Sequence, residues 1–234
     1  WTTQILDHYN APPHGTMHEA DVRCPSSVCI YHADKSGSLI PFLRQRLGMA
    51  AVEVEKPKVA TVAKAVAAPI PVKQWTGGTC DIVIRTHAAD FDWLRYCLQS
   101  ITKFCTGFRR TVILTPDALP GDMPVPDGSL IVAVERKDPD YIGQQITKLM
   151  ADEHTDAEYL FYTDSDCCFT RPITPEDFFI NGKPYWLKTP FGDARQDQAV
   201  WRPVMEKFLG KPADWELMRR HPEMIPRWAL EEMR

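Results

Sequence analysis

The sequence predicts an α/β domain with a mixed, mostly parallel sheet flanked by helices, in residues 79–234. Three observations lead to this prediction. Strand-like apolar segments alternate with segments whose apolar residues recur at helical spacing. One strand-like segment, residues 159–163, runs directly into Asp164 and Asp166. A content of 44% hydrophobic and 25% charged residues is ordinary for a globular protein, and 234 residues are enough for one large domain.

The first half of this region gives three strands and two helices. Residues 81–86 (DIVIRT) are the first strand, and residues 90–105 a helix that Asp90 is placed to cap. Residues 111–114 and 129–135 are strands on either side of a Pro- and Gly-rich loop at 116–128. Residues 141–152 are the second helix. This order is typical of a parallel sheet.

In the second half, the strand that ends at Asp164 is followed by a short edge segment, residues 169–173, because Pro172 cannot donate a ladder hydrogen bond. A helical turn is expected at 175–178, a strand at 184–189 and a helix at 196–209 that stops before Gly210. Residues 215–234 have a helical pattern interrupted by Pro222 and Pro226.

The first third of the chain does not predict a domain. Residues 1–48 hold one plausible strand (28–32) and one helix (39–47), too little to bury a core. Residues 49–78 are rich in Ala, Pro and Lys and are typical of a semi-extended linker.

Composition excludes several classes. A formal net charge of -4 and scattered, unclustered basic residues argue against binding of nucleic acid. Seven cysteines without a C-x-x-C pair predict neither a zinc ribbon nor a disulfide framework, which favours a reducing, cytoplasmic location. Neither a membrane span nor a signal pattern is visible in the sequence.

The Asp164-Ser165-Asp166 motif predicts a divalent-metal site. Side chains at i and i+2 of an extended segment point the same way, so both acids can share one ion. Oxygen ligands suit Mg²⁺ or Mn²⁺, and an ion at the carboxyl end of a strand commonly binds phosphate oxygens. The alternative is a loop whose acids only cap the next segment.

The region from about residue 80 onward resembles the GT-A glycosyltransferases, whose nucleotide-sugar donor is held through a metal by an Asp-x-Asp motif. It is most similar to bacterial and phage-type glycosyltransferase-like domains. Three short strings carry the resemblance in order: Gln-Ile-Thr-Lys-Leu at 145–149, Thr-Asp-Ser-Asp at 163–166, and Met-Arg-Arg-His-Pro at 218–222. The resemblance implies a GT-A-like fold, Mn²⁺ or Mg²⁺, and a UDP- or GDP-linked sugar donor.

GT-A enzymes commonly have a further metal-ligating His in a loop with Gly and Lys near the C-terminus. The matching pattern here lies upstream, at 31–37, where it includes His32. One explanation is a tandem protein, in which residues 1–48 end a first domain, 49–78 link, and 79–234 begin a second that is C-terminally incomplete. The other is that the first segment folds back and His32 completes the site of residues 79–234.

Further roles follow from position. Arg85 and Thr86 end the first strand, where α/β folds place ligands, and are candidates for binding the nucleotide. Lys148, one helix before the motif, is either a phosphate-binding point charge or part of a solvated helix face. Asp193 and Asp197 lie in the loop expected to face the acceptor and are candidate general bases.

These features predict a metal-dependent glycosyltransferase acting on a glycan or another hydroxyl acceptor. A nucleotidyltransferase is less favoured, because residues 85–90 contain no glycine for a phosphate loop. A metal-dependent phosphatase would need a nucleophilic Asp at the end of its first strand, whereas Asp81 opens it. The non-enzymatic alternative is a degenerate module that binds carbohydrate or acts as a scaffold.

Overall fold

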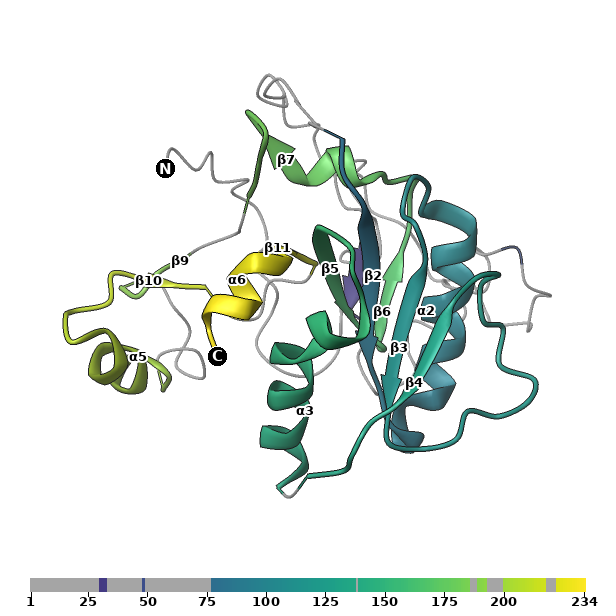
Figure 1. The fold of residues 1–234 in the computed structure, drawn as a ribbon, viewed down its shortest axis with the longest axis horizontal. Coiled ribbons are helices and arrows are strands. Elements are labelled where there is room, and N and C mark those ends of the chain that lie inside the picture. The colour runs from purple at the N-terminus through teal and green to yellow at the C-terminus, as the bar shows by residue number, and fades with distance from the viewer. Residues whose placement is uncertain are drawn as a thin grey trace, which may run out of the picture.

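The structure, a computed structural model, describes residues 30–32, 48, 77–137, 139–185, 189–192, 200–217 and 222–234. In this part of the chain the largest sheet has the strand order β11-β5-β2-β3-β4. Its strands are β2 (Cys80–Arg85), β3 (Thr111–Thr115), β4 (Leu130–Ala133), β5 (Tyr159–Asp164) and β11 (Glu223–Pro226). β2 pairs in parallel with β3 and β5, β4 in parallel with β3, and only β11 is antiparallel. The expectation of a mostly parallel sheet is therefore confirmed (Figure 1).

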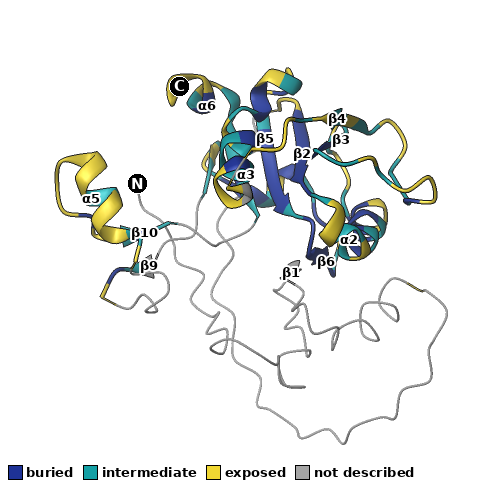
Figure 2. Ribbon diagram, turned by 90° about the horizontal axis from the view of Figure 1, so that it is seen from below, coloured by how far each residue is buried: buried dark blue, intermediate teal, exposed yellow. Residues whose placement is uncertain are grey.

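Helices cover both faces of this sheet (Figure 1). α2 (Phe91–Phe104) packs on one face, where Ile82 and Ile84 of β2 and Phe161 of β5 meet Leu94 and Leu98. Val83, the residue between Ile82 and Ile84, packs on the other face with Leu160 and Leu230. Successive side chains of β2 thus point to opposite faces of the sheet, as in any strand. Because both faces are covered, β2 is buried along its whole length (Figure 2).

α3, the 3₁₀ helix η2 and α6 belong to the second face. α3 spans Asp140–Leu149, η2 Ala151–His154 and α6 Arg227–Glu232. Gly143 permits close packing at the start of α3, since an added Cβ would lie 2.5 Å from the carbonyl oxygen of Lys137. Arg234 binds the buried carboxylate of Asp152 through two hydrogen bonds of 2.7 and 2.8 Å, which joins the segment after α6 to η2.

The remaining elements lie outside the large sheet. They are the 3₁₀ helices η1 (Ala88–Asp90) and η3 (Pro175–Phe178), the strands β6 (Cys167–Phe169), β7 (Phe179–Ile180), β8 (Lys183–Pro184), β9 (Thr189–Pro190) and β10 (Trp215–Glu216), and α5 (Arg202–Leu209). α5 is exposed along most of its surface (Figure 2). The turn predicted at 175–178 is confirmed and has a Thr174–Asp177 capping box.

Several predictions about the second half are wrong. The segment at 169–173 is not an edge strand: β6 begins earlier, at Cys167, and Ile173 makes only an isolated bridge to Cys105. The strand expected at 184–189 is interrupted, because β8 ends at Pro184 and the next residue, Tyr185, lies in no strand; β9 begins at Thr189, and residues 186–188 lie outside the described residues. The helix at 196–209 begins only at Arg202 within the described residues, and it ends at Gly210 in the left-handed conformation as expected.

The prediction of a helical pattern over residues 215–234 is wrong where β11 lies. Residues Glu223–Pro226 form an edge strand of the large sheet, paired with Tyr159–Tyr162. Pro226 is tolerated there because it ends the strand and precedes α6, whose first turn needs no donor from it. Asp90 precedes α2 but makes no side-chain capping bond, and its carboxylate lies 3.1 Å from Nδ1 of His87 instead.

The upstream segment contributes one described strand. β1 (Ile30–His32) pairs antiparallel with β6, with Ile30 opposite Phe169 and His32 opposite Cys167. It agrees with the strand expected at 28–32, of which residues 28–29 lie outside the described residues. The helix expected at 39–47 lies outside them as well.

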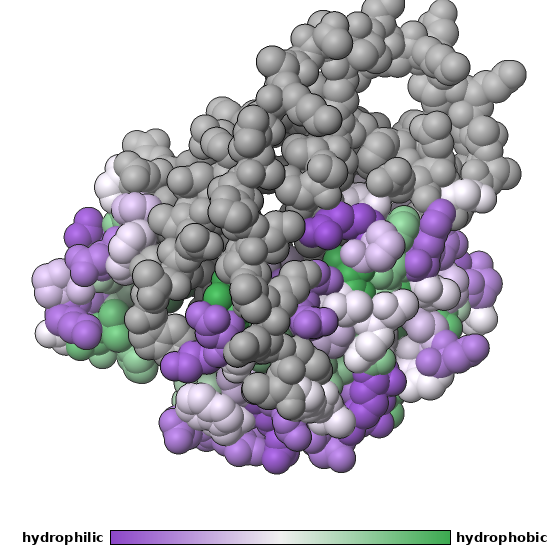
Figure 3. All heavy atoms as spheres, turned by 90° about the horizontal axis from the view of Figure 1, so that it is seen from above, coloured by the Kyte–Doolittle hydropathy of each residue, from purple (hydrophilic) through white to green (hydrophobic). Residues whose placement is uncertain are grey.

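On the face drawn in Figure 3, the described residues are largely hydrophilic or intermediate, with small hydrophobic areas.

Candidate functional site

The carboxyl ends of β2 and β5 form a topological switch point. From β2 the chain moves to β3 and then β4 on one side, and afterwards returns to β5 on the other side of β2. Ligands of open α/β sheets bind outside the carboxyl ends of strands at such a point. In register, Arg85 at the end of β2 lies beside Asp164 at the end of β5. Two of the residues selected from the sequence are therefore brought together.

Asp164 and Asp166 are close in the chain but differ in setting. Asp164 is the last residue of β5, and its side chain is 29% exposed. Asp166 lies in the turn that leads to β6 and is only 8% exposed. The premise that the motif continues an extended segment is wrong, because the strand ends at Asp164. Whether the two carboxylates share an ion thus depends on the turn, not on strand periodicity.

Lys148 is fixed beside Asp164. Its Nζ donates a hydrogen bond of 2.7 Å to Oδ1 of Asp164, and its side chain is 18% exposed. The hydroxyl of Tyr162 donates to the carbonyl oxygen of Lys148 at 2.8 Å, which ties the last turn of α3 to β5. The alternative of a solvated helix face is therefore excluded for Lys148.

Two hydroxyl groups at this edge are buried without hydrogen-bond partners. Thr86 is 1% exposed; its N–H donates to the carbonyl oxygen of Leu114 at 3.0 Å, but its Oγ1 has no partner. Oγ1 of Thr163, the residue before Asp164, has none either. Arg85, which precedes Thr86 and lies opposite Asp164 in the sheet, is itself buried. Buried polar groups are normally hydrogen-bonded, so these two hydroxyls at the switch point are available to a ligand or a water molecule.

Asp117 organises the loops that follow β2, β3 and β4. Its Oδ2 accepts a 2.8 Å hydrogen bond from the N–H of Ala88, and Arg136 donates to both carboxylate oxygens at 2.7 and 2.8 Å. The Ala88 N–H and the Arg136 guanidinium hold the pKa of Asp117 below its usual value. Sequence reasoning missed both residues, although an acid two residues after a strand at the carboxyl edge was the available signal.

Neutral thiols lie beside the turn that contains Asp164 and Asp166, which we call the acidic turn. Cys97 of α2 and Cys167 and Cys168 of β6 are buried, and Sγ of Cys97 lies 3.7 Å from the carbonyl oxygen of Asp164. Burial raises the pKa of Cys168 to about 12, and the Asp166 carboxylate adds to the rise. The five described cysteines carry no disulfide.

The remaining candidates are placed only in part. The backbone register sets His32 opposite Cys167, one residue beyond Asp166, which is the kind of pairing that the fold-back alternative requires. Asp193 and Asp197 lie outside the described residues, as does the Met-Arg-Arg-His string at 218–221.

The carboxylates fit a hard divalent cation. Mg²⁺ is usually bound through one or two carboxylates, with substrate phosphates and water as the other ligands. Asp164 and Asp166 supply that number of carboxylates at the switch point. Among the described residues there is no group of three or more His, Cys, Asp or Glu side chains arranged to hold a metal. An ion here would need ligands from phosphate, water or another part of the chain.

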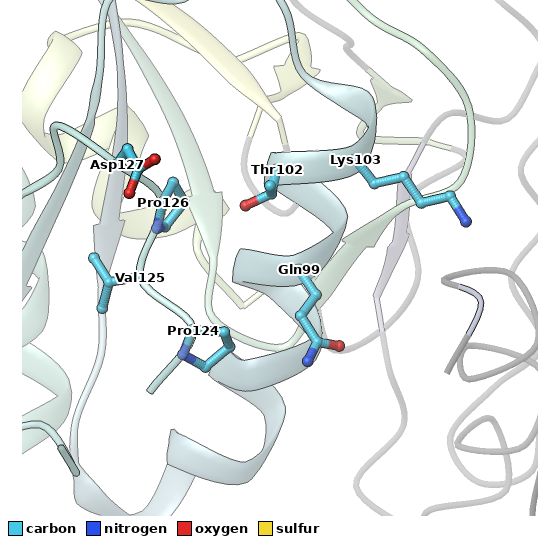
Figure 4. A pocket seen from close by; sticks show the side chains of 7 residues that line it. All are labelled: Gln99, Thr102, Lys103, Pro124, Val125, Pro126 and Asp127. Carbon is cyan, nitrogen blue, oxygen red and sulfur yellow. The ribbon is translucent and has the colours of Figure 1, made fainter. Parts of the chain in front are cut away.

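A groove elsewhere on the domain has one acid in its lining, Asp127, and not a pair of acids. It has a volume of about 500 Å³ and is lined by Gln99, Thr102 and Lys103 of α2 and by residues 124–127 (Figure 4). The end of α2 lies near the amino end of the sheet, because Arg109, which follows α2, donates its N–H to the carbonyl oxygen of Cys80, the first residue of β2. The groove is lined by the last turns of α2 and therefore lies near that end. We therefore locate the candidate site at the carboxyl edge and not in this groove.

The chain belongs to a family of unknown function (DUF6492), whose model matches residues 78–212. The match covers β2 to β5, the acidic turn and α5. No curated protein matches the chain. The described helices include none that is long and apolar enough to cross a membrane.

Proposed function

We propose that the chain is a metal-dependent glycosyltransferase with a GT-A-like fold. It transfers a sugar from a nucleotide-diphosphate donor, UDP- or GDP-linked, to a hydroxyl acceptor such as a glycan. One observation carries the proposal: Asp164, Lys148 and Arg85 converge at the switch point of a mostly parallel sheet. The resemblance of residues 145–166 to GT-A glycosyltransferases supports it.

In this proposal Asp164 and Asp166 hold Mn²⁺ or Mg²⁺, which neutralises the charge of the departing diphosphate. Lys148 lies where its ammonium can reach a phosphate oxygen. Arg85 and the unpartnered hydroxyl of Thr86 bind the nucleotide. His32 is the proposed further ligand, and Asp193 and Asp197 remain the candidate bases for the acceptor hydroxyl.

The second candidate is a degenerate module that binds carbohydrate or acts as a scaffold. It is favoured by the lack, within the described residues, of a third His, Cys, Asp or Glu ligand grouped with the two acids. The two functions differ in one property: the enzyme binds nucleotide more tightly when the metal is present, whereas the module does not.

The test is calorimetric titration of UDP and GDP into the full chain, with and without Mn²⁺. The comparison is between wild type and an Asp164→Asn, Asp166→Asn double variant, which keeps side-chain size and removes both charges. Asp214→Asn changes an exposed acid elsewhere and is the matched control.

We expect binding of one nucleotide that requires Mn²⁺, is lost in the double variant and is retained in the control. Wild-type protein that binds neither nucleotide under any metal condition would contradict the enzyme and favour the module.

A further inference from the structure

The ammonium of Lys148 is a cation that Asp164 binds in this structure. Its ammonium lies 2.7 Å from Oδ1 of Asp164, one of the oxygens that a divalent ion at the motif would use. Both side chains are partly shielded from water, at 18% and 29% exposure. A metal ion that binds through Oδ1 competes with the ammonium for this oxygen, and an ion on the other oxygen of Asp164 would still lie close to the ammonium's like charge.

The surrounding backbone lets the ammonium move alone. The Tyr162 hydroxyl bonds the Lys148 carbonyl oxygen, so the end of α3 stays attached to β5 whatever the side chain does. A lysine side chain is a flexible four-carbon stem with a mobile point charge. Its ammonium can therefore leave Asp164 and reach a neighbouring anion without a change in the fold.

Local charge favours such a transfer when a metal and a diphosphate arrive together. The two carboxylates carry a charge of about -2, which a divalent ion balances alone. A metal that binds by itself then leaves the Lys148 ammonium without its anionic partner and close to a like charge. A diphosphate that binds with the metal supplies a new anionic partner for that ammonium.

We propose that Lys148 couples the two ligands: a divalent cation displaces its ammonium from Asp164, and the ammonium then binds the diphosphate of the nucleotide. The inference rests on the proposed function for the identity of that anion. Without metal and nucleotide, Lys148 is paired with Asp164 and acts as a positioning residue. With both ligands bound, Lys148 acts as a binding residue for the diphosphate. By linkage, the factor by which Mn²⁺ tightens nucleotide binding equals the factor by which nucleotide tightens Mn²⁺ binding.

The test uses Lys148→Met, which keeps the stem and removes the charge. Three titrations are compared with wild type: Mn²⁺ alone, UDP or GDP alone, and the nucleotide at saturating Mn²⁺. We expect Mn²⁺ alone to bind about threefold more tightly, the scale of a partly exposed ion pair. We expect the nucleotide with Mn²⁺ to bind about tenfold more weakly, because a charge-assisted bond to phosphate is lost.

Two further variants serve as controls. Lys148→Arg keeps the charge and should retain most of the coupling between metal and nucleotide. Lys207→Met removes an exposed lysine of α5 and should leave all three affinities unchanged. Lys148→Gln replaces Lys148→Met if circular dichroism shows that the latter is not folded.

The outcomes separate this inference from the proposed function. If wild type binds nucleotide with Mn²⁺ but Lys148→Met does not tighten Mn²⁺ alone, or does not weaken the nucleotide, the coupling role is wrong and the proposed function stands. If neither wild type nor variant binds Mn²⁺ or nucleotide, both fail. Tighter Mn²⁺ together with weaker nucleotide supports the coupling.

Discussion

The two ends of the central sheet both hold buried or half-buried acids beside basic residues, yet they differ in how fully the polar groups are paired. At the amino end, Asp81 of β2 has a side chain with 0% exposure and accepts bonds of 2.8 and 2.7 Å from Arg109 and 3.1 Å from Arg110. Thr155 donates to the same carboxylate, and Arg109 also binds Asp156. At the carboxyl end, the hydroxyls of Thr86 and Thr163 are buried without partners.

This difference separates a structural cluster from a binding site. The groups around Asp81 satisfy one another, so a ligand there would have to break existing bonds. The groups around Asp164 include polar atoms for which folding supplies no partner, although leaving them unpaired is costly. We infer that the amino end stabilises the fold and that the carboxyl end is kept for a ligand.

Asp81→Ala should destabilise the protein by about 3 kcal/mol, the scale for removing one partner of a buried ion pair. The cause is that Arg109 and Arg110 lose a shared anion at the amino end of the sheet. Urea denaturation followed by circular dichroism measures the effect. Asp156→Ala removes an exposed partner of the same arginines and should leave stability unchanged. Equal effects of the two variants would contradict a buried structural role for Asp81.

Stability should also fall in acid because of Asp81. Burial alone would raise its pKa, but hydrogen bonds from Arg109, Thr155 and Arg110 outweigh burial and hold the pKa below its ordinary value. A lowered folded-state pKa stabilises the protein above the unfolded value of about 4 and ceases to do so as pH falls through the folded value. Urea midpoints measured between pH 6 and pH 2 should drop below about pH 4. The drop should be smaller in Asp81→Asn, and an equal drop in that variant would refute the assignment.

Asp117→Asn should weaken nucleotide binding in the presence of Mn²⁺ about fivefold, because a neutral amide holds Arg136 less strongly than a carboxylate does. The loop that contains Ala88 would then lose part of its support at the site. Calorimetry measures the effect. Asp122→Asn removes the charge from an exposed acid that is likewise paired with an arginine, Arg95 of α2, and should bind as wild type does. Identical affinities in both variants would remove Asp117 from the site.

Asp164→Asn should change stability by less than about 1 kcal/mol, because ion pairs with partial exposure contribute little. Its effect should be confined to binding of metal and nucleotide. Urea denaturation at pH 7 measures it, with Asp81→Ala as the reference. A loss as large as that of Asp81→Ala would show that Asp164 is a structural residue and would end the contrast between the two ends.

The sequence predicted those parts of the fold that local patterns determine. β2, α2, β3, α3 and β5 follow from apolar periodicity and lie within a few residues of their expected positions. β11 could not be predicted, because residues 223–226 become a strand only by pairing with β5, some sixty residues earlier. That partner is invisible to a local pattern, and Pro222 and Pro226 suggested only an interrupted helix.

The candidate site was predicted in the same uneven way. The apolar segments that precede them predicted that Asp164 and Arg85 each lie at the end of a strand. The two strands are parallel neighbours in the sheet, which brings the two residues together. The contact between Lys148 and Asp164 depends on how α3 packs on β5, which no spacing specifies. Asp117 and Arg136 were missed because their role depends on three loops meeting at one edge.

Locating a bound metal ion would decide whether the carboxyl ends of β2 and β5 form the binding site. Crystals of the full chain soaked with Mn²⁺ and UDP or GDP would locate the ion by its anomalous scattering. We predict one peak in contact with the carboxylates of Asp164 or Asp166, with the diphosphate beside Lys148. A peak at another acidic group, or nucleotide bound away from the carboxyl ends of β2 and β5, would contradict this prediction.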